Sequence, residues 1–99
     1  MKIVLVCGAG MSTSILVQKM VKEAANREGD FNIYAVSLSG TKGELEDADI
    51  VLLGPQVSFK KNELATKFAP VPVEVINSID YGMMDGKKVL DFAIEKSKK

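Results

Sequence analysis

The sequence has no histidine, no tryptophan and a single cysteine among its 99 residues. Without histidine, the chain can form neither a Cys–His catalytic pair nor most of the zinc sites found in proteins. A lone cysteine cannot form an internal disulfide, and unpaired thiols are typical of a reducing compartment, so we expect a cytoplasmic protein. The function of the single cysteine, Cys7, must therefore be explained by its own surroundings.

The sequence also lacks an excess of charge of either sign and lacks a long apolar run. Thirteen Lys and Arg residues balance thirteen Asp and Glu residues, whereas nucleic-acid-binding domains normally carry a basic excess. No apolar run approaches the ~20 residues that a membrane-spanning helix needs, and the first residues lack the length and cleavage site of a signal peptide. We therefore expect one globular domain, residues 1–99, that binds no nucleic acid and does not span a membrane.

What the sequence does contain is an alternation of strand-like and helix-like segments. Apolar or alternating runs predict four strands, at residues 2–6, 31–36, 50–53 and 70–75. Apolar residues at helical spacing predict helices at residues 15–25, 44–48 and 85–94, and another within residues 57–68 that starts near Ser58 or Lys60. Strands that alternate with helices imply right-handed βαβ units. The predicted fold is an α/β domain, a single four-stranded parallel sheet flanked by helices.

Particular residues predict where some of these elements begin and end and how they lie in the fold. Pro70 and Pro72 cannot donate ladder hydrogen bonds, which predicts that the fourth strand lies at a sheet edge. Residues 77–82 are expected to form a turn, and Asp85 to cap the last helix. The first helix is expected to bury one stripe: Leu16, Val17, Met20, Val21, Ala24 and Ala25.

The turn between the first strand and the first helix has the sequence CGAGMSTS, residues 7–14. Glycines allow backbone N–H groups to face an anion, and the following helix start adds about half a positive charge at the same place. These donors also favour the thiolate form of a cysteine, which is a strong nucleophile toward phosphorus. We therefore predict Cys7 as the catalytic nucleophile. The predicted phosphate-binding loop consists of Gly8, Ala9, Gly10, Met11, Ser12, Thr13 and Ser14.

Other phosphate-binding loops fit these residues less well. A dinucleotide fingerprint would have glycine where this chain has Thr13, and a Walker loop would have a lysine, which this turn lacks. A Cys-based phosphatase of the low-molecular-weight type has arginine six residues after its cysteine. Here that position is again Thr13, so the guanidinium that would stabilise the transition state of hydrolysis is missing. The loop is better suited to accept and release a phosphoryl group than to hydrolyse a phosphoester.

The residues alone leave two alternatives to a phosphoryl carrier. One is a regulatory module whose loop holds an anion without covalent chemistry, and the other is the Cys-based phosphatase. A cysteine at the end of a strand is also often only a small buried apolar residue.

Residues 7–20, CGAGMSTSILVQKM, resemble the active loop and first helix of the cytoplasmic enzyme IIB component of the sugar phosphotransferase system (PTS), lactose/cellobiose (β-diglucoside) type. The resemblance continues through residues 51–57, 71–76 and 80–90 and covers nearly the whole chain. It implies a four-stranded parallel sheet with a phosphate-binding loop like that of low-molecular-weight tyrosine phosphatases. One departure is Gly8-Ala9, where some relatives carry hydroxyl residues, so that this loop depends more on backbone donors.

The resemblance also implies a reaction and its partners. Cys7 would accept a phosphoryl group from a phosphohistidine on enzyme IIA and pass it to a sugar bound by the membrane enzyme IIC. The sugar would be cellobiose, lactose, chitobiose or a related β-disaccharide. The step would require neither a metal nor a dissociable cofactor. We expect a monomer that meets these partners transiently.

Three residues outside the loop are further candidates. Gln56 follows the third predicted strand, and Asp80 and Tyr81 follow the fourth. The carboxyl ends of parallel strands share one edge, so Gln56 either reaches the phosphate cradle or serves only as a turn residue. For Asp80 and Tyr81, capping and packing between the last strand and last helix is the favoured interpretation.

Overall fold

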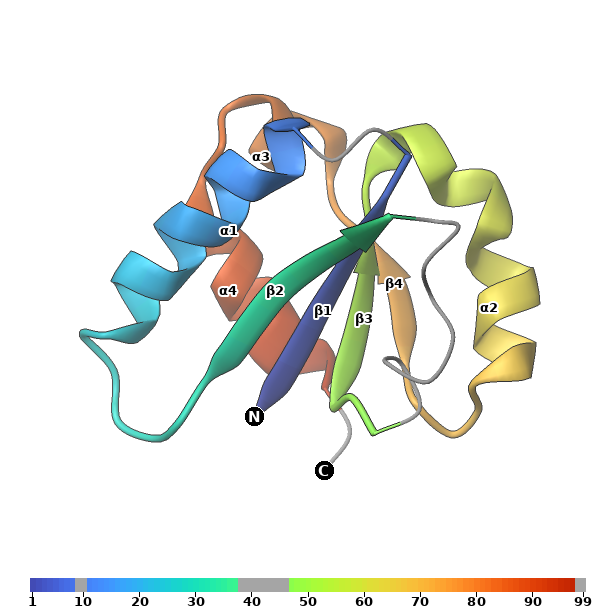
Figure 1. Ribbon diagram of the computed structural model, residues 1–99, viewed down its shortest axis with the longest axis horizontal. Coiled ribbons are helices and arrows are strands. Elements are labelled where there is room, and N and C mark those ends of the chain that lie inside the picture. Colours follow the sequence, from blue (N-terminus) through green and yellow to red (C-terminus); the bar gives the residue numbers. More distant parts are fainter. Residues whose placement is uncertain (9–10, 38–46, 98–99) are drawn as a thin grey trace.

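Four parallel strands form the sheet of the computed structural model, which describes residues 1–8, 11–37 and 47–97, the side chains of residues 11–13 excepted (Figure 1). The strands are β1 (Lys2–Cys7), β2 (Asn32–Ser37), β3 (Ile50–Leu53) and β4 (Val73–Val75). Their spatial order is β2-β1-β3-β4. The chain therefore moves one way from β1 to β2 and the other way to β3 and β4. This reversal puts the switch point, where ligands bind in open parallel sheets, at the carboxyl ends of β1 and β3.

Helices cover both faces of the sheet (Figure 1). They are α1 (Met11–Ala24), the 3-10 helix η2 (Pro55–Lys60), α2 (Lys61–Lys67), α3 (Ser78–Gly82) and α4 (Gly86–Lys96). Helices α1 and α4 pack against each other on one face, whereas α2 lies on the other. The predicted α/β fold, with four parallel strands between helices, is thus confirmed.

Alternation along the buried strands divides the core into two clusters. Ile3 and Leu5 of β1 point to the α1/α4 face, and Val4 and Val6 point to the α2 face. All four are fully buried, as expected of a central strand that is covered on both faces. The same alternation in β3 sends Leu52 to the α1/α4 face and its neighbour Leu53 to the α2 face.

The predicted apolar stripe of α1 is partly wrong. Leu16, Met20 and Ala24, spaced by four residues, are buried as expected. Val21, however, is 48% exposed, and Ala25 is also exposed. Each lies one residue, or about 100° of helix rotation, beyond a buried position, so it falls at the margin of the stripe where neither the sheet nor α4 covers it.

Three further boundaries differ from the prediction. Residues 77–82 do not form a simple turn, because Asn77 caps the short helix α3 through hydrogen bonds from the backbone N–H groups of Ile79 (2.8 Å) and Asp80 (3.3 Å). The helix predicted to start near Ser58 or Lys60 is α2, which begins at Lys61, and the 3-10 helix η2 precedes it; the backbone of Val57 (φ −116°, ψ 22°) is not helical. Strand β4 is shorter than predicted and lies at the edge as expected. Most of the predicted helix 44–48 lies outside the described residues.

Candidate active site

Cys7 is the last residue of β1 and lies at the carboxyl edge of the sheet. Continued alternation puts its side chain on the same face as Leu5, that of α1 and α4. Its partner in β2 is Ser37. On the other side the ladder extends past β3, since the backbone N–H of Gly54 donates to the carbonyl of Val6 (3.0 Å). Cys7 therefore lies between Ser37 and Gly54 at the switch point of the sheet, and it is only 3% exposed.

Helix α1 begins at Met11, four residues after the thiol, and runs back over the sheet from this edge (Figure 1). The first four N–H groups of an α-helix have no partner within the helix, so the start of α1 presents donors and a positive dipole end near Cys7. Packing around Gly8 would accept a methyl group, because a Cβ there would lie 3.8 Å from Val57 Cγ1. The local packing of the described residues therefore does not require glycine at this position.

The structure describes the predicted phosphate-binding loop only in part. It describes Cys7, Gly8 and the exposed Ser14 in full, and it gives the helical backbone of Met11, Ser12 and Thr13. Ala9, Gly10 and the three side chains at 11–13 lie outside the described residues.

Gln56 lies beside Gly54 at the edge of the sheet. A Cβ at Gly54 would lie 2.8 Å from Gln56 Oε1 and 3.6 Å from Tyr81 Cε1. The space that a side chain at 54 would fill is thus occupied by a carboxamide from η2 and a phenol ring from α3. Gln56 Nε2 donates to Tyr81 Oη across 3.5 Å, which is a long hydrogen bond. The structure thus places the Gln56 side chain against Gly54 and Tyr81, and its contact with the phosphate cradle stays a prediction.

Tyr81 and Asp80 have different roles. The packing interpretation is confirmed for Tyr81, since its buried ring belongs to the core cluster on the α1/α4 face. The ring also brings its hydroxyl to the edge next to Gln56, which the sequence did not indicate. Asp80 has a structural role, because its N–H donates to Asn77 and its carbonyl accepts from the N–H of Asp85 (3.0 Å), connecting α3 to the start of α4.

Exposed apolar side chains border this edge. Phe59 of η2 is 72% exposed, and Ile79 and Met83 of α3 are 68% and 71% exposed. Both elements follow the carboxyl ends of strands, at the top of Figure 1. Large exposed apolar side chains on neighbouring elements are candidates for a protein–protein contact.

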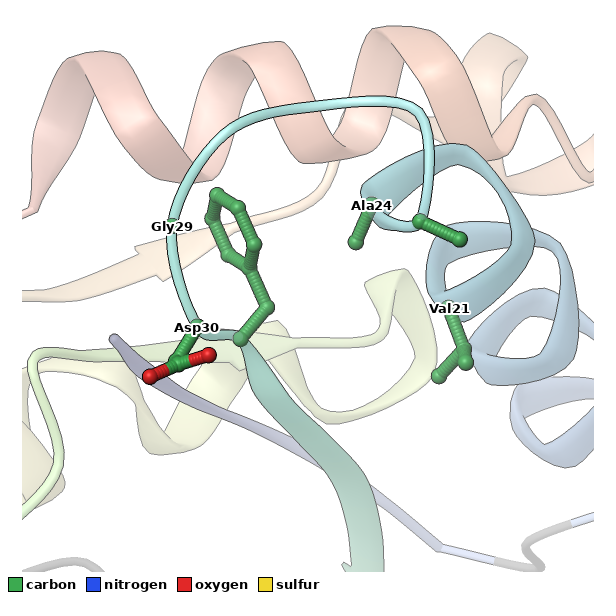
Figure 2. Close-up of a pocket in the computed structure, with 6 residues that line it drawn as sticks. Val21, Ala24, Gly29 and Asp30 are labelled. Atoms are coloured by element: carbon green, nitrogen blue, oxygen red, sulfur yellow. The ribbon is translucent and has the colours of Figure 1, made fainter.

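A surface hollow of about 220 Å³ lies at the opposite end of the molecule. Figure 2 shows Val21 and Ala24 of α1 opposite Gly29 and Asp30, which lead into β2. These residues belong to the amino edge of the sheet, so the hollow is separate from Cys7. Among residues 1–8, 11–37 and 47–97, no group of three or more His, Cys, Asp or Glu side chains is placed to hold a metal ion. No helix in this part of the chain is long and apolar enough to cross a membrane.

A buried thiol at the switch point of a parallel sheet, next to a helix start, defines a class of α/β proteins suited to holding phosphoryl groups. Comparison with known families agrees with this class. The family described as "PTS system, Lactose/Cellobiose specific IIB subunit" matches residues 2–92. The chain therefore belongs to this family, and its role is that of a phosphoryl carrier, a phosphotransferase component of the sugar PTS. The predicted resemblance of the chain to this family is confirmed.

Individual relatives cover most of the chain. The cellobiose-specific EIIB component of Lactococcus lactis subsp. lactis (strain IL1403) is 50% identical over 95 residues, covering 89% of this chain and 88% of the relative. The galactose-specific EIIB component of L. lactis subsp. cremoris (strain MG1363) has the same identity and coverage. The solution structure of a cellobiose-specific phosphotransferase IIB component from Borrelia burgdorferi is 44% identical, with a TM-score of 0.77 over 100% of this chain and 96% of that one.

Proposed function

We propose that Cys7 carries the phosphoryl group as a phosphocysteine. The observation that carries this proposal is the position of its thiol, at the end of the central strand and four residues before the start of α1. In the transfer, an S–P bond forms on Cys7 as the P–N bond of a phosphohistidine on enzyme IIA breaks. The electron pair of the P–N bond returns to the ring nitrogen, and the thiol proton ends on the imidazole. The donor's ring thus serves as the proton acceptor, and this chain needs no histidine of its own.

Residues 8–14 would hold the three phosphoryl oxygens. The N–H groups at the start of α1 supply donors that are already aligned and a positive dipole end. The space at Gly8 supports a role in chemistry, because packing against Val57 does not require a glycine. An oxygen held by backbone donors needs the chain to approach closely, which a side chain at this position would hinder.

The partners would be enzyme IIA as donor and membrane enzyme IIC, with its bound sugar, as acceptor. Phe59, Ile79 and Met83 supply an apolar border at the carboxyl edge on which such partners can pack. We further propose that the chain acts as a monomer of one domain, residues 1–99, in the cytoplasm, where a reducing environment keeps its thiol free to react.

The sugar would be cellobiose, lactose, chitobiose or a related β-disaccharide. Two relatives with the same 50% identity are named for two different sugars, cellobiose and galactose. Overall identity in this component therefore does not determine the sugar. This agrees with a mechanism in which the membrane component binds the sugar and the IIB component supplies only the phosphoryl group.

The test is intact-mass analysis after incubation with phosphorylated enzyme IIA. We expect one added phosphoryl group on the unmodified chain, located on Cys7 by peptide mapping, and none on Cys7→Ser. Ser58→Ala serves as a matched control, since it removes an exposed hydroxyl from η2. Phosphate held without added mass would indicate a noncovalent anion-binding module instead. Steady release of phosphate from an aryl phosphate by the isolated chain would indicate a phosphatase.

A further inference from the structure

Val57 is the one buried residue of η2, and it packs against the first residue of the predicted phosphate-binding loop. Its side chain is 4% exposed and belongs to the core cluster on the α2 face. Apart from the glycine's chain neighbours, Val57 Cγ1 is the only atom of the described residues within 4 Å of a Cβ built at Gly8, at 3.8 Å. This is an ordinary contact distance, so a methyl group of Val57 covers the side of Gly8 on which a side chain would stand.

The same short segment, from Gly54 to Val57, also holds the chain just before Cys7. The backbone N–H of Gly54 donates to the carbonyl of Val6 (3.0 Å), and the N–H of Val57 donates to the carbonyl of Gly54 (3.0 Å). Val6 and Gly8 are the two neighbours of the cysteine, so the segment contacts the chain on both sides of it. Alternation along the chain puts these neighbours on the α2 face and Cys7 on the opposite face, so the contacts do not cover the thiol.

We infer that Val57 is a positioning residue for phosphoryl transfer, which holds Gly8 where its backbone can approach the phosphoryl group. This inference rests on the proposed phosphocysteine at Cys7. The N–H of Gly8 is the first backbone donor after the thiol, and a displacement of about 1 Å near a reacting group can cost up to about 100-fold in rate. Glycine has no side chain with which to fix its own position, so the surface against which it lies must fix it.

The backbone of Val57 supports a role beyond packing. Its angles, φ −116° and ψ 22°, are not helical although it lies within η2, and its side chain is buried while both of its neighbours in the chain are exposed. A hydrogen bond to Gly54 fixes its backbone independently of the surrounding side chains. A cavity elsewhere in the α2-face cluster should therefore leave the contact with Gly8 in place. The role belongs to Val57 and not to the cluster as a whole.

The experiment measures transfer from phosphorylated enzyme IIA to Cys7 by rapid quench and intact mass, over a range of donor concentrations and corrected for the folded fraction. Val57→Ala should lower the maximal rate by about 10-fold. It should leave the half-saturating donor concentration unchanged, because the buried side chain is not exposed to the donor. Val57→Ile keeps both Cγ atoms and should stay within about twofold of the unmodified maximal rate.

Val73→Ala is the matched control. It removes the same two methyl groups from the same cluster, and Val73 is 3% exposed, but it lies in the edge strand β4, which β3 separates from β1. The two alanine variants should lower the urea midpoint alike, whereas Val73→Ala should leave the maximal rate unchanged. Val57→Leu keeps the core filled but moves the branch of the side chain one carbon further out, so it should displace Gly8 and slow transfer by about threefold.

Equal maximal rates for the unmodified chain and Val57→Ala would overturn the inference. Equal slowing by Val57→Ala and Val73→Ala would overturn it as well, because the stability of the cluster would then explain both effects. A change in the half-saturating donor concentration alone would indicate a role in docking instead. If Val57→Ala does not fold, an unmodified rate in Val57→Leu overturns the inference. Failure of the unmodified chain to accept a phosphoryl group would instead overturn the proposed function.

Discussion

The two faces of the sheet are built differently. On the α1/α4 face, two long helices lie against each other over a core of Leu, Ile, Met and Tyr side chains. On the other face, the seven-residue helix α2 and the 3-10 helix η2 cover a core made largely of valine and leucine. Cys7 and Tyr81 both belong to the first face. The candidate site therefore lies on the face where α1 and α4 pack against each other. The helices on the other face, α2 and η2, mainly cover the core.

Leu52 and Leu53 allow a direct test of the difference between the two faces. They are neighbours of the same type, both fully buried, and they point to opposite faces. We expect Leu52→Ala and Leu53→Ala each to lower the free energy of unfolding by about 3 kcal/mol, measured by urea denaturation. Only Leu52→Ala should also slow transfer to Cys7 in the fraction that remains folded, because its cavity opens in the core cluster on the α1/α4 face, which also contains Tyr81. Equal losses of transfer rate in both variants would contradict the division between the faces.

Gly86 tests the contact between α1 and α4. A Cβ at Gly86 would lie 2.7 Å from the carbonyl carbon of Lys19 and 2.8 Å from its oxygen, both backbone atoms that cannot move aside alone. Gly86→Ala should therefore lower the free energy of unfolding by about 2 kcal/mol, since the helices must separate.

The matched control for this change is Gly82→Ala. Apart from its chain neighbours and the backbone of α3, no atom of the described residues lies within 4 Å of a Cβ built at Gly82, so this variant should unfold within about 0.5 kcal/mol of the unmodified chain. A similar destabilisation by both changes would show that the cost arises from glycine replacement in general and not from the close approach of α1 and α4.

Arg27 provides the smallest test. Its guanidinium lies 2.6 Å from the carboxylate of Asp91 in α4 and 3.3 Å from that of Glu23 in α1. The hydrogen bond to Asp91 raises the pKa of Arg27 above its ordinary value, so the guanidinium stays charged at neutral pH. Exposed ion pairs are weak and screened by salt. Arg27→Gln should lower the thermal midpoint slightly at low salt, and 1 M NaCl should remove the difference. A difference that persists in salt would indicate lost packing of the Arg27 stem.

Much of this fold could be predicted from the sequence, because the strongest signals are local. The apolar runs of β1 and β3 identify buried strands, and the prolines before β4 identify an edge. The margins of the buried stripe on α1 were harder to predict. Whether Val21 is buried depends on how far α4 extends along α1. Helix α3 was missed although Asn77 is a strong cap, because five residues carry too little periodicity to stand out.

The candidate site, like the fold, was predictable where its residues are close together in the chain and not where they are far apart. The sequence of residues 7–14 indicates a phosphate-binding loop, because the thiol, glycines and hydroxyls are adjacent in the chain. The contact of Gln56 with Tyr81 joins residues 25 positions apart and depends on side-chain rotamers, neither of which periodicity reveals. The sequence contains no clear sign of it, because Gly54 directly after a buried strand is equally typical of a strand end.

The buried position of Cys7 at the carboxyl edge of the sheet affects the order in which the two partners bind. A sulfur that is reached from only one side can face one partner at a time, so on the proposed mechanism the donor must leave before the acceptor can dock. Protein pairs associate with rate constants of about 10⁵–10⁷ M⁻¹s⁻¹, and differences in affinity arise mostly from dissociation. A carrier of this kind works fastest when neither complex lasts long, which favours a small apolar border such as Phe59, Ile79 and Met83 over an extensive interface.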